Sequence, residues 1–350
     1  MTRTGIAFVL TAAAFAQSPA HDALRLNEQG NTASDAGNYG EAAARYREAI
    51  EIWRTQGPEY KAHLAASTMN LGTVLCAEGR RVEGAAAFTE ALALHRAVLG
   101  PRHKRTLINM TLLASDYLML GELQQVQAIL DEALPLARAE FSIDVQLARC
   151  LEIQSGLLNR HGKAKEAIAP AEEALRIAIQ TAGEDSLETG LAYSAAAEAL
   201  RTAGQQNRAL PLYRKARSVY EKFLGPEHPR VASLWSQEGL IEMDEGKLST
   251  AEQSMLKAIE LLKKTCPDCA VEMAVAESNL GLLRLKQKRY HEADEVFSQA
   301  INLRERLLPT AVPELAQAID NLAYTRRLEH RDQDAEQLAQ RAAGMMAAFR

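Results

Sequence analysis

Small and apolar residues recur along the chain at a fixed spacing of about 42 residues. One column consists of alanines, and its steps are 42 residues long except for one step of 41: Ala49, Ala91, Ala133, Ala174, Ala216, Ala258, Ala300 and Ala342. A second column holds only small residues and has the same period, again with one step of 41 residues: Gly30, Gly72, Ala114, Ser155, Ala197, Gly239, Gly281 and Ala323. A period of this length indicates a solenoid of supersecondary units, each of which buries its core against its neighbours.

A third column predicts where each unit turns. Its members are Gly37, Gly79, Gly121, Gly162, Gly204, Gly246, Lys288 and His330. Glycine ends helices because it adopts the left-handed conformation at little cost, so each position is expected to separate a first helix from a second one. In the second helices a further column lies three residues before the alanines and shares their side of the helix: Tyr46, Phe88, Leu130, Ala171, Tyr213, Met255, Phe297 and Ala339.

These features resemble the marks of tetratricopeptide repeats. The seventh unit carries Asn279-Leu280-Gly281 and Tyr290-His291-Glu292-Ala293. Two connections, which begin at Leu99 and at Leu224, read Leu-Gly-Pro-x-His. The long period is similar to the subtype found in kinesin light chains. The resemblance covers nearly everything after Ser18 and implies an all-α fold, a right-handed α-solenoid of about eight helix-turn-helix pairs. It implies a binding role without naming a partner, because such repeats serve many unrelated proteins.

The repeat predicts one elongated domain over residues 17–350. The boundaries of its units are expected near 21–58, 59–101, 102–141, 142–184, 185–226, 227–268, 269–309 and 310–350.

The first sixteen residues do not follow the repeat pattern of the rest of the chain. Arg3 precedes an apolar run from Ile6 to Phe15, and Ala14-Phe15-Ala16 matches an A-x-A cleavage site. Residues 1–16 are therefore expected to be a bacterial-type secretory signal peptide, which makes the protein periplasmic or secreted. The alternative is an apolar first helix of the solenoid. No later segment reaches the roughly 20 apolar residues that span a bilayer, so a membrane-spanning protein is not expected.

The charge balance disfavours nucleic acid as a partner. The chain has 40 Lys and Arg against 45 Asp and Glu, a net charge of −5. Removal of residues 1–16 removes only Arg3, so the balance becomes 39 against 45. An acidic protein of this kind is a poor general binder of phosphate backbones.

The four cysteines suggest one local crosslink. Cys266 and Cys269 lie in a connection between repeats, where a disulfide is the leading interpretation for an exported protein and a redox-active pair is the second. A zinc site would need a second pair of ligands. Cys76 and Cys150 are expected to be separate buried thiols. We expect no metal site and no cofactor.

Enzyme signatures are incomplete. The stretch from Gly156 to Gly162-Lys163-Ala164 imitates a phosphate-binding loop but has one residue too many and no hydroxyl after the lysine. Ser254 and Lys257 match Ser-x-x-Lys, although its companion motifs are missing. We therefore expect no catalytic residues and a non-enzymatic protein.

The candidate binding surface is the groove that first helices line in such solenoids. Asn70, Asn279 and Asn321 share one column, and amide side chains can hold a peptide backbone. Lys286 and Arg327 add positive charge nearby, so the hypothesis is that repeats seven and eight bind an acidic segment or a C-terminal carboxylate. The alternative is that these residues are solubilising charges and helix-end caps.

A second, mixed-charge strip is expected in the middle of the groove. It consists of Arg149, Glu152, Asn159, Arg160, Glu198 and Arg201. The strip could equally be an internal ladder of salt bridges.

The last helix suggests another function. Met345, Met346 and Phe349 have no capping repeat after them, so they could form a surface for self-association or belong to a frayed tail. The sequence thus predicts an interaction scaffold that binds a peptide or protein partner, with a self-assembling structural subunit as the alternative.

Overall fold

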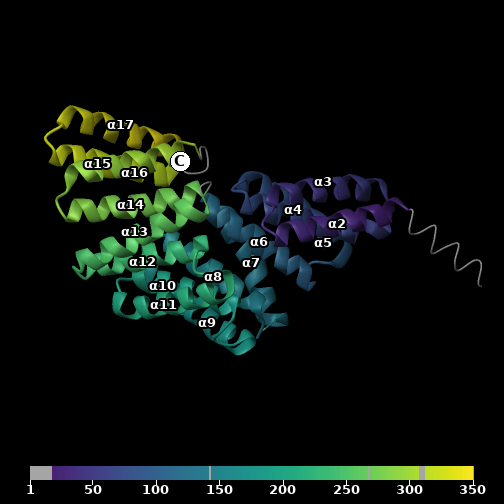
Figure 1. Cartoon of the computed structure of the whole chain (residues 1–350). Helices are drawn as coiled ribbons and strands as arrows, with labels where there is room; N and C mark the ends of the chain where they lie inside the picture. The colour runs from purple at the N-terminus through teal and green to yellow at the C-terminus, as the bar shows by residue number, and fades with distance from the viewer. Residues whose placement is uncertain (1–17, 142, 267–268, 307–311, 350) are drawn as a thin grey trace, which may run out of the picture. The chain divides into compact units, whose positions relative to one another are not determined.

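A computed structural model describes residues 18–141, 143–266, 269–306 and 312–349. Every regular element in these ranges is helical, with sixteen α-helices and one short 3-10 helix along the chain (Figure 1). The prediction of an all-α repeat fold of about eight helix pairs is confirmed. The proposed signal peptide at 1–16 lies outside the described residues.

The helices form two compact units, 1–142 and 143–350. The first unit contains the first helices α2 (Pro19–Asp35), α4 (Lys61–Ala77) and α6 (Lys104–Leu120), the second helices α3 (Tyr39–Thr55), α5 (Arg81–Leu99) and α7 (Leu123–Glu140), and the 3-10 helix η1 (Pro58–Tyr60). A single domain over residues 17–350 stays a prediction.

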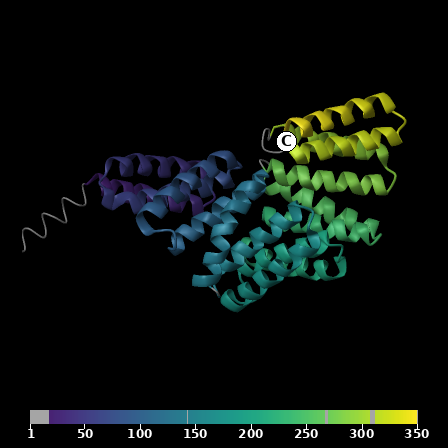
Figure 2. The same cartoon turned by 180° about the vertical axis from the view of Figure 1, so that it is seen from behind.

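The second unit contains five helix pairs. Its first helices are α8 (Val145–Arg160), α10 (Leu187–Thr202), α12 (Pro229–Asp244), α14 (Ala270–Lys286) and α16 (Val312–Leu328). Its second helices are α9 (Ala164–Ala182), α11 (Gln206–Leu224), α13 (Leu248–Thr265), α15 (Tyr290–Glu305) and α17 (Asp332–Phe349). Helices α14 to α17 lie side by side when the molecule is seen from the front and from behind (Figures 1 and 2).

The turn between the two helices of every pair has the conformation that the sequence predicts. All eight residues of the turn column have positive φ angles, between 60° and 81°. Six of them are glycines, whereas Lys288 and His330 adopt this conformation with a side chain. L residues with a side chain are strained there, which makes the turns of the last two pairs the exceptions in the column.

The small-residue column explains how the two helices of a pair approach each other. A Cβ atom built on Gly281 would lie 2.6 Å from Cε1 of Phe297, and one built on Gly72 would lie 2.8 Å from Cε1 of Phe88. Both aromatic rings are almost fully buried. Each ring therefore occupies the space that a larger residue on the first helix would take.

The C-terminal helix partly buries the two methionines that suggested self-association. Met345 and Met346 are half-buried and pack against the core of the last two pairs, which includes Phe297 and Ile319. The side chain of Phe349 lies outside the described residues. The expected apolar surface is therefore smaller than the sequence suggested, because α17 buries much of it against α15 and α16.

Candidate functional site

The second unit curves toward its first helices. Helices α8 and α10, α12 and α14, and α14 and α16 pack against one another, although each also packs against its second helix. The curve brings α8 and α16 together, because Nη1 of Arg160 lies 3.0 Å from Oε1 of Glu314. This contact joins the fourth helix pair to the eighth.

We call the side of α8, α10, α12, α14 and α16 that faces this curve the inner face. On α8 the spacing of three and four residues places Arg149, Glu152 and Asn159 on the same side as Arg160. The repeat register extends this side to the other first helices, including Glu198 on α10 and the column Gln237, Asn279 and Asn321.

Part of the mixed-charge strip is paired internally. The hydroxyl of Tyr213 donates to Oε2 of Glu198 at 2.6 Å, and Nη2 of Arg201 lies 2.7 Å from Oε1 of the same carboxylate. Burial raises the pKa of the Tyr213 phenol, and the Glu198 charge adds to the shift. For Glu198, burial acts to raise the pKa, but the bonds from Arg201 and Tyr213 outweigh it and the pKa is lowered. This part of the strip is an internal ion pair.

Two other members of the strip remain available. Glu152 is half-buried, and no hydrogen bond or ion pair joins its side chain to another described residue. Burial raises the pKa of the Glu152 carboxyl to about 7, although the positive charge of Arg149 opposes the shift. Oδ1 of Asn159 is buried and has no hydrogen-bond partner among the described residues.

The asparagine column is divided between the two units. Asn279 and Asn321 lie on neighbouring first helices of the second unit, whereas Asn70 lies on α4 of the first. Asn279 is 8% exposed and donates through Nδ2 to the hydroxyl of Ser236 at 2.9 Å. Asn321 accepts a bond from Gln317 at 3.2 Å. Asn321 is thus the more accessible of the two.

Sequence reasoning missed Gln237, which precedes Asn279 by 42 residues in the same column. Its Oε1 atom is buried and has no hydrogen-bond partner among the described residues. The signal was present in the sequence, because glutamine offers the same amide donor and acceptor as asparagine.

Most of the basic residues near repeats seven and eight have internal partners. Nζ of Lys286 donates to the backbone carbonyl of Met243 at 2.6 Å, so this lysine caps the end of α12. Arg327 is exposed, and no ion pair joins it to another described residue. The positive charge that an acidic partner could meet is therefore smaller than the sequence suggested, because internal carboxylates and carbonyls take up part of it.

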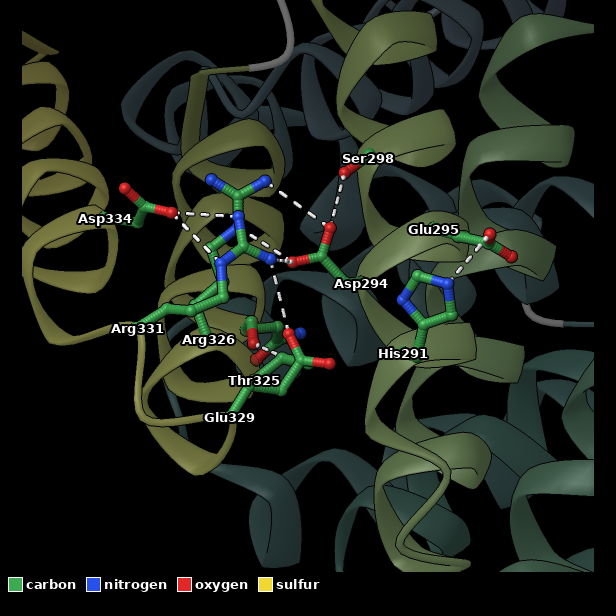
Figure 3. Close-up of polar contacts among 10 residues, drawn as sticks. His291, Asp294, Glu295, Ser298, Thr325, Arg326, Glu329, Arg331 and Asp334 are labelled. Atoms are coloured by element: carbon green, nitrogen blue, oxygen red, sulfur yellow. Dashed lines mark hydrogen bonds and ion pairs between the residues drawn. The ribbon is translucent and has the colours of Figure 1, made fainter.

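Arginines of the last helix pair form ion pairs with Asp294 of the preceding pair. The guanidinium groups of Arg326 and Arg331 converge on its carboxylate, with Nε of Arg326 at 2.8 Å and Nη1 of Arg331 at 3.2 Å (Figure 3). The same contact occurs 42 residues earlier, where Arg284 and Arg289 meet Glu252. These ion pairs link consecutive repeats and form a structural ladder.

Asn70 contributes to a hollow in the first unit. Its Nδ2 atom donates to Oδ1 of Asn31 at 3.3 Å, and the hydroxyl of Tyr46 donates to the same oxygen at 2.7 Å. These residues line a cavity of about 320 Å³.

Cys266 and Cys269 are joined by a disulfide, with their Cα atoms 5.3 Å apart, in the connection between α13 and α14. Cys76 and Cys150 are free thiols, and burial raises the pKa of each to about 12. Within the described ranges, no group of three or more His, Cys, Asp or Glu residues could hold a metal ion. None of the described helices combines the length and the apolar character that crossing a membrane requires.

Comparison with known proteins gives a family and a set of similar folds. The family model described as tetratricopeptide repeat matches residues 63–139, 151–222 and 272–348. No curated protein sequence matches the chain at a significant level.

Three solved structures illustrate the similarity. The apo form of the quorum sensor NprR from B. thuringiensis has a TM-score of 0.66 and 14% identity, covering 93% of this chain and 87% of that one. NprR in complex with its cognate peptide NprX has a TM-score of 0.64 and 15% identity, covering 91% and 85%. A Rap protein complexed with competence and sporulation factor has a TM-score of 0.67 and 13% identity, covering 88% and 80%. At these identities the likeness concerns the fold alone.

Proposed function

This chain belongs to the tetratricopeptide repeat family, and we propose that it is a non-enzymatic scaffold that binds a peptide segment of a partner along the inner face of α8 to α16. The family supports a binding role. The similar fold of NprR, solved with its cognate peptide, supports a peptide as the class of ligand.

The observation that carries the proposal is the presence, on first helices of the inner face, of side-chain oxygen atoms that lack a hydrogen-bond donor. Oδ1 of Asn159 and Oε1 of Gln237 are buried without a hydrogen-bond partner in the described part of the chain. A buried polar atom in this state costs about 1–3 kcal/mol. Rotation of either amide side chain toward the inner face would let the N–H groups of an extended peptide supply the missing donor.

The experiment compares peptide binding by the natural chain and by Gln237→Leu. Short linear peptides displayed on phage are selected on the protein, and the affinity of an enriched peptide is then measured. We expect Gln237→Leu to weaken that peptide about tenfold, since one hydrogen bond of about 1.4 kcal/mol is lost. The free variant should be at least as stable, because leucine removes the unfilled acceptor. Asn207→Leu, at an exposed position of the second helix α11, is the matched control.

The proposal also assigns contacts in repeats seven and eight. Asn321 and Arg327 are accessible and would meet the backbone and an acidic group of the peptide. Asn279 and Lys286 would first have to exchange their bonds to Ser236 and Met243. An enriched peptide without an acidic group would contradict this assignment and leave the inner-face site intact.

We further propose that the protein is exported. The disulfide between Cys266 and Cys269 supports this proposal, because such bonds persist mainly in oxidising compartments. Fractionation of the producing cells with amino-terminal sequencing tests it. An exported form that begins at Gln17 is expected, and a reduced cytoplasmic form that retains Arg3 would contradict it.

A further inference from the structure

The cavity in the first unit opens where the ends of two first helices meet. It has a volume of about 320 Å³ and receives side chains from α2, α3 and α4. Its lining consists of Asn31, Ser34, Asp35, Tyr46, Asn70, Thr73 and Val74.

The hydrogen bonds inside the cavity leave several oxygen atoms free to accept. The hydroxyl of Tyr46 and the Nδ2 atom of Asn70 both donate to Oδ1 of Asn31. The Tyr46 hydroxyl hydrogen and one N–H of Asn70 are therefore used internally. The phenolic oxygen of Tyr46 and Oδ1 of Asn70 can still accept hydrogen bonds. The ionised Asp35 carboxylate is an acceptor and has no donor. These free acceptors, together with an ionised carboxylate, suit a ligand that carries hydrogen-bond donors.

Asp35 makes the site negative. It is the last residue of α2, where the backbone already carries partial negative charge, and the last turn contains no basic residue. Asp35 is exposed, and no ion pair or hydrogen bond joins its side chain to another described residue. The pKa of Tyr46 is raised by burial and, in addition, by the Asp35 charge, so the carboxylate acts on this cavity.

In the second unit, a lysine side chain occupies the position that corresponds to this cavity in the repeat register. Met243 and Asp244 are in register with Ser34 and Asp35, since 244 − 35 is 209, or five periods with the one step of 41 residues among them. There the ammonium group of Lys286 donates to the carbonyl of Met243 at 2.6 Å. The residue in register with Lys286 in the first unit is Ala77, since 286 − 77 is also 209. Ala77 has no group that could donate to the Ser34 carbonyl, which accepts from the backbone N–H of Gly37.

We propose that this cavity binds a primary ammonium group, from a lysine side chain or a free amino terminus of a partner, in the place that Lys286 occupies in the second unit. Asp35 neutralises the charge, while the Ser34 carbonyl, the Tyr46 oxygen and Oδ1 of Asn70 accept its hydrogens. The inference concerns the first unit and does not depend on peptide binding at the inner face of the second.

Three short peptides test the proposal on the full chain. One is a glycine peptide with blocked ends and a central lysine, the second is a glycine peptide with a free amino terminus, and the third carries acetylated lysine and blocked ends. Titrations followed by NMR should shift the side-chain amide signals of Asn31 and Asn70 with one or both ammonium peptides. The acetylated peptide should leave these signals unchanged. The difference between the first two identifies the source of the ammonium group.

Two variants and one control complete the test. Asp35→Asn, at an exposed helix end, should weaken ammonium binding at least tenfold while circular dichroism stays unchanged. Ala77→Lys should abolish binding by placing an internal ammonium group in the cavity. Asp244→Asn is the matched control, because Lys286 already fills the corresponding place.

Equal binding of the acetylated peptide, or undiminished binding by Asp35→Asn, would overturn the proposal. Absence of any shift with both ammonium peptides would overturn it as well. The effect of Gln237→Leu on the phage-selected peptide is read separately in the second unit, so failure of one site is distinguishable from failure of the other.

Discussion

Arg160 and Glu314 are 154 residues apart in the sequence, yet Nη1 of the first lies 3.0 Å from Oε1 of the second. The pair joins the end of α8 to the beginning of α16 and so closes the curve of the first helices in the second unit. Both side chains are partly exposed, which limits the strength of the contact.

A double-mutant cycle tests whether this contact exists in solution. Replacement of Arg160 and Glu314 by alanine, singly and together, should give a coupling energy of about 0.2–1 kcal/mol, as measured for exposed pairs. Chemical denaturation followed by tryptophan emission in a Trp53→Phe background reports on this unit through Trp235. Glu272, 42 residues before Glu314, provides the control, and its coupling to Arg160 should be zero within error. A coupling of zero at Glu314 would contradict the closed curve.

A larger residue at Gly281 should destabilise the seventh helix pair. Its Cβ would lie 2.6 Å from Cε1 of the buried Phe297 ring, so Gly281→Ala should lower the free energy of unfolding by about 1–3 kcal/mol. Gly344→Ala is the comparison, since nothing lies within 4 Å of a Cβ there. That change should stabilise α17 by about 0.5–1 kcal/mol. Thermal unfolding of both variants checks the contrast, and equal effects would refute the close packing.

The turns at Lys288 and His330 should gain stability from glycine. Their φ angles of 60° and 61° are strained for residues with a side chain. Lys288→Gly and His330→Gly should each raise the free energy of unfolding by about 1 kcal/mol, whereas Gly246→Lys should lower it by a similar amount. Denaturant titrations measure the three changes. Destabilisation by both glycine variants would show that the side chains contribute more than the strain costs.

Glu152 should make the stability of the second unit depend on pH. Burial raises the pKa of its carboxyl from 4.5 to about 7 in the folded protein. The folded state therefore holds the proton more tightly than the unfolded chain, so the stabilisation is present at low pH and is lost as pH rises from about 4.5 through about 7. The loss is at most about 1.4 kcal/mol per pH unit.

Glu152→Gln should remove this dependence. The variant should become progressively more stable than the natural chain between pH 5 and pH 8, in unfolding titrations at constant ionic strength. Glu188→Gln, at an exposed position near the start of α10, serves as the comparison. A constant difference between Glu152→Gln and the natural chain over this range would contradict the raised pKa.

Periodicity predicted the elements that every repeat must share. The turn column from Gly37 to His330 could be found because each pair needs one left-handed residue there. The small column could be found because a ring such as Phe297 needs space on the first helix. Both constraints act within one repeat and therefore appear in the sequence at a constant spacing.

The site residues were harder to predict, because they depend on contacts between repeats. Lys286 was predicted to meet an acidic partner, but the structure places its ammonium group against the carbonyl of Met243 in the preceding repeat. The approach of Arg160 to Glu314 follows from curvature accumulated over four repeats, which no local pattern encodes. The ammonium site proposed at the Ser34 carbonyl follows only from comparison with the contact that Lys286 makes in the folded second unit.

The central claim is that a peptide lies along the inner face of the second unit. Hydrogen exchange measured by mass spectrometry, with and without a phage-selected peptide, tests it most directly. Slower exchange in α8, α10, α12, α14 and α16, with α9, α11 and α13 unchanged, is the predicted result. Protection confined to the second helices, or to residues 18–141, would contradict the account.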